Sequence, residues 1–241
     1  MTLTSPCALH LFARHAGAPP APGRIEAAPP TAPLGAGDFY HDAASGTLYY
    51  QLAAGQSLAQ LNSDAWIATK ETLVEYNGTA RQSWENVQFQ HSTWMQVNSP
   101  DGFVDTQATV FACTHGITEL CNLGNEGEPL GAVRVSGGKD LAWNGCEFAH
   151  IGSAWALSVQ GSSKGVSVNG STFRDLSGGF LKLGSVAPRD NTKADRALWD
   201  EGFSATFNSA HTQAVEYGGA PGYFGGWISH STISHNVSDV F

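Results

Sequence analysis

Imidazole and carboxylate side chains recur at one position of a repeated strand pattern, two residues after an apolar side chain expected to face inward. Along the chain, this position holds His91, His150, Asp175 and Asp239. His150 and Asp175 fall in neighbouring repeats, where the carboxylate can orient the imidazole so that the two work as an acid/base pair. The alternative is a structural polar ladder that ends each strand and hydrogen-bonds its turn.

Acidic side chains near this position suggest glycoside hydrolysis. That reaction needs two carboxyl groups about 5 Å apart for retention of configuration, or about 6.5–9.5 Å apart for inversion. Asp175 with Glu147, or Asp175 with Asp239, would meet this requirement if the strand register brings them together. The candidate catalytic residues are therefore Glu147, His150, Asp175 and Asp239.

A second set of polar side chains alternates with apolar residues in three strands. Arg134, Ser158 and Lys182 would project outward and stack at the strand spacing of about 4.8 Å. Such a column suits a linear polysaccharide, and its two cations favour carboxylated or sulfated sugars; an ordinary solvated face is the alternative. Asp105 and Trp94 are further candidates for sugar binding, as a loop acid and a stacking ring, although Trp94 can equally be a core residue.

The strands that must position these side chains belong to a sequence repeat. Residues 132–136, 156–160 and 180–184 share one apolar alternation at a spacing of 24 residues. Alternation with a period of two is typical of strands, and Asn-Gly pairs between them tolerate the positive φ of tight turns. Strands at a near-constant spacing, each unable to bury its apolar face alone, indicate an all-β solenoid of the parallel β-helix type.

The rest of the chain is organised around this repeat. Residues 1–36 are rich in Ala, Pro and Gly and predict a disordered lead-in, whereas residues 37–50 predict a β-hairpin. The β-helix domain spans residues 37–241, with insertions near 92–131 and 185–204 that can wall a binding face. Because the last repeat shows no polar cap, we expect an incomplete solenoid, a fragment of a longer one.

Composition limits the partners. The 241 residues include 12 basic and 21 acidic side chains, a net charge of −9, which argues against nucleic acid. The sequence has no apolar run of about 18 residues to span a membrane, and its start lacks the features of a signal peptide.

Of four cysteines, Cys113 and Cys121 could pair in an oxidising compartment, and Cys146 is expected in the core. Without a metal motif or a compact acidic cluster for Ca²⁺, we predict no cofactor, and we expect a monomer.

Several motifs together resemble a known family. The sequence GDFYHDAASGTLYY at residues 37–50 resembles the opening motif GEFYxDxxxGTLYY of large right-handed parallel β-helix proteins, and residues 132–135, 146–152, 173–179 and 232–236 look like their successive coils. These proteins belong to the pectin-lyase-like group and include glycoside hydrolases of the fucosidase and xylanase types. The resemblance implies a right-handed parallel β-helix, a carbohydrate-acting ancestry and an extracellular or cell-surface location. Family members are longer and their catalytic carboxylates lie in later coils, so the resemblance assigns no catalytic residue here.

Three functions remain open at this point. The first is a glycoside hydrolase-like protein that acts on or binds a polysaccharide along the outer face of the solenoid. The second is a non-catalytic β-helix that binds glycan or builds a cell surface. The third is a uronate lyase or epimerase, which Arg134, Lys182 and the His150–Asp175 pair would favour. Two carboxylates in range would support the hydrolase, and a polar face without such a pair would support the binding protein.

Overall fold

The computed structural model describes residues 11–13, 33–42, 45–98, 101–106, 109–113, 126–129, 131–185 and 196–239. Most of the predicted lead-in lies outside these residues. The described part of the chain is mainly strand, with one α-helix and two short 3₁₀ helices. None of the helices in this part is long and apolar enough to cross a membrane.

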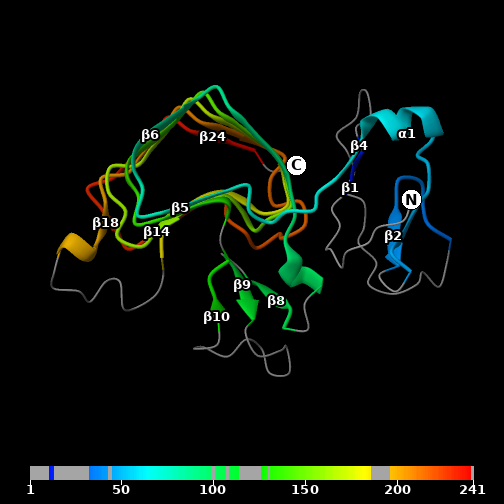
Figure 1. Cartoon of the computed structure of the whole chain (residues 1–241), viewed down its shortest axis with the longest axis horizontal. Helices are drawn as coiled ribbons and strands as arrows, with labels where there is room; N and C mark the ends of the chain where they lie inside the picture. Colours follow the sequence, from blue (N-terminus) through cyan, green and yellow to red (C-terminus); the bar gives the residue numbers. More distant parts are fainter. Residues whose placement is uncertain are drawn as a thin grey trace.

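Three five-stranded parallel sheets form the body of the protein (Figure 1). Sheet A contains β5 (Val74–Asn77), β11 (Gly131–Ser136), β14 (Trp155–Gln160), β17 (Gly179–Gly184) and β21 (Tyr223–Gly226). Sheet B contains β6 (Ala80–Glu85), β12 (Lys139–Asn144), β15 (Ser167–Asn169), β19 (Ser204–Thr206) and β23 (Thr232–Ser234). Sheet C contains β7 (Gln88–Ser92), β13 (Glu147–Ile151), β16 (Thr172–Leu176), β20 (Ser209–His211) and β24 (Val237–Ser238). Each successive strand triplet is one coil, numbered 1 to 5, and the whole is an all-β stack consistent with the predicted solenoid.

The strand register follows the spacing read from the sequence. Val133 pairs with Leu157, and Leu157 pairs with Leu181, so the apolar alternation at a spacing of 24 residues is one inward column of sheet A. In a parallel stack the side chains of neighbouring strands lie in line, because a shift by one residue would turn the apolar set outward.

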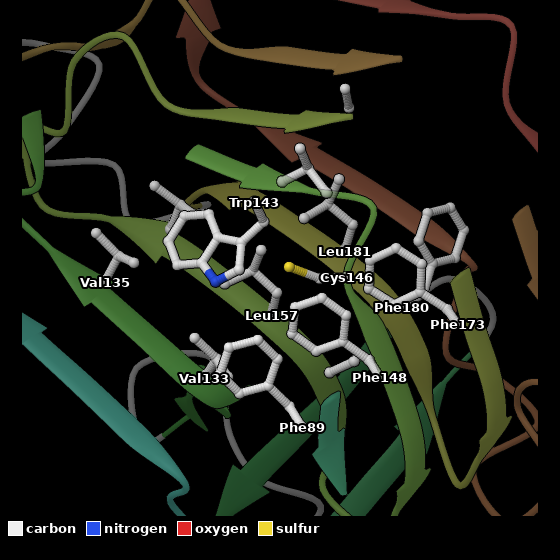
Figure 2. Close-up of a cluster of buried hydrophobic side chains, with 14 of the residues drawn as sticks. Phe89, Val133, Val135, Trp143, Cys146, Phe148, Leu157, Phe173, Phe180 and Leu181 are labelled. Atoms are coloured by element: carbon white, nitrogen blue, oxygen red, sulfur yellow. The ribbon is translucent and has the colours of Figure 1, made fainter. Parts of the chain in front are cut away.

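Apolar side chains from all three sheets point into the stack and form one core (Figure 2). The rings of Phe89, Phe148 and Phe173 lie on one another, with centroids 4.9 and 4.7 Å apart, so each of these coils adds one ring to a column. Cys146 lies in the same core and is 1% exposed, which confirms its predicted place. Burial of one Phe side chain stabilises the fold by about 1.5–3 kcal/mol, so this column binds the coils together.

Each coil turns at residues with left-handed backbone. At the corner between sheets B and C these residues are Asn86, Gly145, Gly170, Phe207 and His235, all with φ of 56–60°. Glycine adopts this conformation without the cost of roughly 1–2 kcal/mol that a Cβ brings. Both glycines belong to the Asn-Gly pairs that the sequence predicted as turns.

The residues before coil 1 form a hairpin and a helix. β2 (Phe39–Asp42) and β3 (Thr47–Tyr50) pair antiparallel, as the predicted β-hairpin requires. α1 (Leu58–Asp64) begins at a capping box formed by Ser57 and Gln60 and leads into β4 (Ala65–Ile67). β4 pairs antiparallel with β1 (Leu11–Ala13), a short strand from within the segment predicted as a lead-in.

Two insertions interrupt the stack. The first contains η1 (Met95–Asn98) and an antiparallel sheet of β8 (Phe103–Thr106), β9 (Thr109–Cys113) and β10 (Glu126–Gly127), which lies below sheet A in Figure 1. Cys113, at the end of β9, is disulfide-bonded, and its predicted partner Cys121 lies outside the described residues. The second insertion contains η2 (Arg196–Leu198) and β18 (Asp200–Glu201), which pairs with β22 (Ile228–Ser229) of coil 5.

Candidate functional site

A hydrogen-bonded network lies on the outside of sheet C. His150 Nδ1 is 2.5 Å from Asp175 Oδ2, and Arg174 Nη1 is 3.2 Å from His150 Nε2. A guanidinium can only donate, so His150 Nε2 accepts, and Nδ1 carries the proton that it donates to Asp175. This arrangement holds a neutral imidazole between a cation and a carboxylate, in a single tautomer.

Glu147 extends the network over three coils. Arg174 Nε is 2.5 Å from Glu147 Oε1, and Gln90 Nε2 is 3.4 Å from Glu147 Oε2. The side chains of Glu147 and Arg174 are 22% and 32% exposed, and that of Asp175 is 20% exposed. The network therefore lies at the boundary with solvent, where a ligand on the outside of sheet C can reach it.

An aromatic stack holds the imidazole of His150 in place. The ring of His91 lies 4.9 Å from that of His150 with the two planes 7° apart, and the ring of Trp66 lies 4.8 Å from that of His91 at 10°. These distances equal the spacing of neighbouring parallel strands, about 4.8 Å. Trp66, from β4, thus occupies the place that a preceding coil would fill, and the stack restricts His150 to the plane in which it bonds Arg174 and Asp175.

The backbone at this edge of sheet C is strained. His91, His150 and Asp175 have φ values of 62°, 55° and 54°. A non-glycine residue in this conformation costs on the order of 1–3 kcal/mol, and such residues cluster at functional sites. At the corner between sheets B and C, coils 2 and 3 use Gly145 and Gly170 for the same conformation. Side chains retained against this cost favour a role for the side chains themselves.

The structure brings together three of the four predicted catalytic residues. Glu147, His150 and Asp175 are joined through Arg174. Each carboxylate has its own partner, Arg174 for Glu147 and His150 for Asp175. A substrate that uses either carboxylate must therefore share or displace one of these bonds.

Asp239 lies outside the network because its register differs from the predicted one. Ser238, rather than Val237, continues the inward column of coil 4, and Val237 is 62% exposed. Asp239 Oδ2 is 2.8 Å from His211 Nδ1. It lies two coils from Asp175, a separation of roughly 9.6 Å at the strand spacing of parallel sheets. The predicted common column is wrong, because Asp239 lies one residue, not two, after the inward position of coil 5. Its pairing with Asp175 stays a prediction.

The outward column of sheet A is closed by the first insertion. Arg134, Ser158 and Lys182 are in register as predicted, but Ser158 and Lys182 are only 1% and 3% exposed. Lys182 Nζ is 2.5 Å from Glu128 Oε2, Gly131 N donates to Ser158 Oγ, and Arg134 Nε donates to Gly131 O. Burial lowers the pKa of Lys182, although the nearby Glu128 carboxylate opposes this effect. The prediction of a solvent-facing, sugar-binding column is wrong at Ser158 and Lys182, because the returning insertion covers them.

Trp94 and Asp105 also have structural partners. Trp94 is 6% exposed, and its ring lies 5.3 Å from that of Phe103 and 5.2 Å from that of Tyr217. Trp94 belongs to a small apolar cluster beside the main core, which also contains Val110, Trp155 and Tyr217. Its predicted role as a sugar-stacking ring is therefore wrong. Asp105 is exposed, and its Oδ1 accepts a hydrogen bond from Gly219 N. Asp105 thus ties β8 to the segment before β21, away from the network on sheet C.

Two members of the site are absent from the predicted set. Arg174 stands between an inward Phe173 and Asp175, so strand alternation alone places it on the outer face. Trp66 lies in a connector with no sequence assignment, and its stacking on His91 carries no sequence signal. Among the described residues, no three His, Cys, Asp or Glu side chains gather in a way that could hold a metal ion.

Comparisons with known proteins give one informative likeness. No protein-family model matches the chain, and no curated protein matches it. Among solved structures, the chain is similar to a glycoside hydrolase, with a TM-score of 0.64 and 25% sequence identity over 77% of this chain. The chain spans about a third of that protein's length, 34%. The likeness fits a β-helix-like stack.

Proposed function

We propose that the chain is a right-handed parallel β-helix of the pectin-lyase-like kind. We also propose that it is a glycoside hydrolase-like protein that acts on a neutral polysaccharide along the outside of sheet C. The observation that carries this proposal is the Glu147–Arg174–His150–Asp175 network, which places two carboxylates at a solvent boundary. The similarity to a solved glycoside hydrolase supports the same class of ligand.

Sheet C offers the better face for a linear glycan. Its outward side chains in coils 1 to 4 are mostly polar, and those that are exposed or half-buried are Gln88, Gln90, Glu147, Thr172, Arg174, Ser209 and His211. Rows of hydroxyl, amide and charged groups can donate to and accept from sugar hydroxyls at each coil step. The outside of sheet A lacks this property because the first insertion buries Ser158 and Lys182.

The charges of the network favour a neutral sugar. Arg174 is the one guanidinium between two carboxylates, and the hydrogen-bond pattern holds His150 as a neutral imidazole. Lys182, one of the two cations that suggested an acidic sugar, is already paired with Glu128. A carboxylated or sulfated chain would meet net negative charge on sheet C, so a uronate lyase or epimerase has less support here than a hydrolase.

In this role, Glu147 and Asp175 supply the two carboxyl groups that glycoside hydrolysis needs. His150 orients Asp175 through its Nδ1–H, and Arg174 orients Glu147. A second candidate, a non-catalytic glycan-binding protein, is favoured by the fact that each carboxylate already has a partner.

The test measures released reducing sugar and retention on the same panel of neutral and acidic polysaccharides. We expect release from a neutral polysaccharide, and a loss of about 10²–10⁴-fold in Asp175→Asn and Glu147→Gln. Glu85→Gln is the matched control, because Glu85 is an exposed carboxylate on sheet B that is likewise hydrogen-bonded, by Asn144. Retention without release in the native protein would support the binding protein instead. Neither retention nor release would reject both.

A further inference from the structure

An exposed aromatic ring stands at the corner between sheets B and C in coil 4. Phe207 is 62% exposed and has a φ of 57°. The fold thus bears two costs at this residue, an apolar ring in water and a Cβ in a left-handed backbone conformation. The two preceding coils avoid both costs with Gly145 and Gly170 at the same corner. An aromatic ring kept under these conditions calls for a reason beyond the turn.

One face of this ring is supported and the other is open. On one side the ring of Phe207 lies 4.8 Å from that of His235, with an angle of 21° between the planes. On the other side the neighbouring coil has Gly170, whose N–H donates to Thr206 O at 3.0 Å. A Cβ placed on Gly170 would meet no atom within 4 Å apart from its own chain neighbours, so this corner position is open.

This opening is specific to Gly170. At Gly145, one coil earlier, an added Cβ would come within 2.6 Å of Asn86 Oδ1, because the Asn86 side chain lies over that position. Between Asn86 and Phe207 the corner therefore contains one unfilled place, as deep as one coil step of about 4.8 Å. We refer to it as the Gly170 slot.

A polar group borders the Gly170 slot. Asn169 is exposed, and its Oδ1 accepts a hydrogen bond from Thr206 Oγ1 at 2.8 Å. Within the described part of the chain, its amide nitrogen, which can donate two hydrogen bonds, has no hydrogen-bond partner. A flat apolar ring beside amide donors matches a pyranose, which presents C–H groups on one face and hydroxyls at its rim.

We propose that Phe207, Gly170 and Asn169 form a sugar-binding subsite that takes one pyranose ring of a neutral glycan in the Gly170 slot, stacked on the free face of Phe207. This proposal rests on the proposed function and adds a subsite where the corner borders sheet C. The subsite contributes binding, while the carboxylates of the network lie on coils 2 and 3.

The test uses variants whose effects on folding and on binding have opposite signs. Phe207→Gly removes the ring and relieves the left-handed Cβ, so we expect glycan affinity to fall about tenfold while the urea midpoint of unfolding stays equal or rises. Gly170→Asn fills the slot with a residue that tolerates the same backbone, and we expect a similar loss of affinity. Trp227→Gly is the matched control, because it also removes an exposed aromatic ring from a left-handed residue but lies after β21, outside the Gly170 slot, so we expect unchanged affinity.

The outcomes separate this proposal from the function on which it rests. If the native protein binds glycan and both variants bind equally well, the subsite is wrong and the proposed function stands. If Phe207→Gly lowers the unfolding midpoint, the ring is a packing residue, which also overturns the subsite. If the native protein retains no glycan of the panel, the proposed function fails and the subsite fails with it.

Discussion

Replacing Glu128 by Gln should destabilise the protein, because it removes the carboxylate paired with the buried ammonium of Lys182 and leaves only the weaker influence of Asp200. The side chains of Lys182 and Glu128 are 4% and 18% exposed, and Ser185 Oγ donates a further bond to Glu128 Oε1 at 2.9 Å. Breaking a buried pair by removing one partner costs about 3–5 kcal/mol. Glu128 keeps some contact with solvent, and Gln160 Oε1 remains 3.5 Å from Lys182 Nζ. We therefore expect Glu128→Gln to lower the free energy of unfolding by about 3 kcal/mol, the lower end of that range.

The cost should depend on pH in a defined direction. Burial lowers the pKa of Lys182 in the folded state below its ordinary value of 10.5. Between the lowered value and 10.5 the unfolded chain binds the proton more tightly, so this group makes stability rise with pH over that window. Removing Glu128 lowers the folded pKa further, because the carboxylate opposes the effect of burial. The loss caused by Glu128→Gln should therefore be greatest at neutral pH and shrink as pH rises toward 10.5.

Urea unfolding followed by near-ultraviolet circular dichroism measures this difference at pH 7 and at pH 10. The control is the double variant Glu128→Leu with Lys182→Met, which removes both charges and should lie within about 1 kcal/mol of the native protein at pH 7. A loss below about 1 kcal/mol for Glu128→Gln at pH 7 would mean that Lys182 is not desolvated as the structure shows. An equal loss at both pH values would refute the assignment of the loss to a buried charge.

Three further predictions follow from the core, from a buried phenol and from the corners. Phe148→Ala should cost about 3–5 kcal/mol in urea unfolding, because its fully buried ring lies between those of Phe89 and Phe173; a cost near that of an exposed site would contradict the ring column. Burial raises the pKa of Tyr223 to about 12. The neutral phenol therefore contributes its full share of folding stability below pH 10, and this share is lost as pH rises toward 12. Tyr223→Phe should make the free energy of unfolding fall less steeply between pH 10 and pH 12, and an equally steep fall would contradict the raised pKa. Gly170→Ala should cost about 1–2 kcal/mol through its backbone alone, and Gly145→Ala should cost more because its Cβ would also meet Asn86 Oδ1 at 2.6 Å; equal unfolding midpoints for the two variants would contradict this difference.

The sequence repeat predicted which residues lie next to each other in neighbouring coils, because this depends only on a constant spacing. Once Phe148 and Phe173 are in register, the residues two positions later must lie in neighbouring coils, so the contact between His150 and Asp175 could be foreseen. Asp239 could not be placed in this way, because coil 5 pairs Ser238 with Ala210 and leaves Val237 in solvent. An apolar residue type does not indicate an inward position there, because a short edge strand does not enforce strand alternation.

Burial of Ser158, Lys182 and Trp94 could not be predicted because it depends on where an insertion returns. Strand alternation says correctly that Lys182 leaves the core of the stack. Whether it then meets water or a carboxylate is decided by Glu128, which lies 54 residues away in the sequence. Such contacts carry no periodic signal, so a sequence pattern gives the direction of a side chain but not its surroundings.

The corners distinguish the edge of sheet C from the other turns of the stack. At the corner between sheets A and B, coils 1 and 2 use Arg81 and Asp140, whereas coils 3 and 4 use Gly165 and Gly202. Between sheets B and C, coils 2 and 3 use Gly145 and Gly170. The edge after sheet C has no glycine in coils 1 to 4, where the left-handed residues are His91, His150, Asp175 and Thr212. A stack that needed only to turn there could use glycine and avoid on the order of 1–3 kcal/mol at each coil. The side chains of this edge are therefore the feature that the repeat does not explain. Two of them, His150 and Asp175, bond each other, and His150 also bonds Arg174, which holds Glu147 on the outside of sheet C.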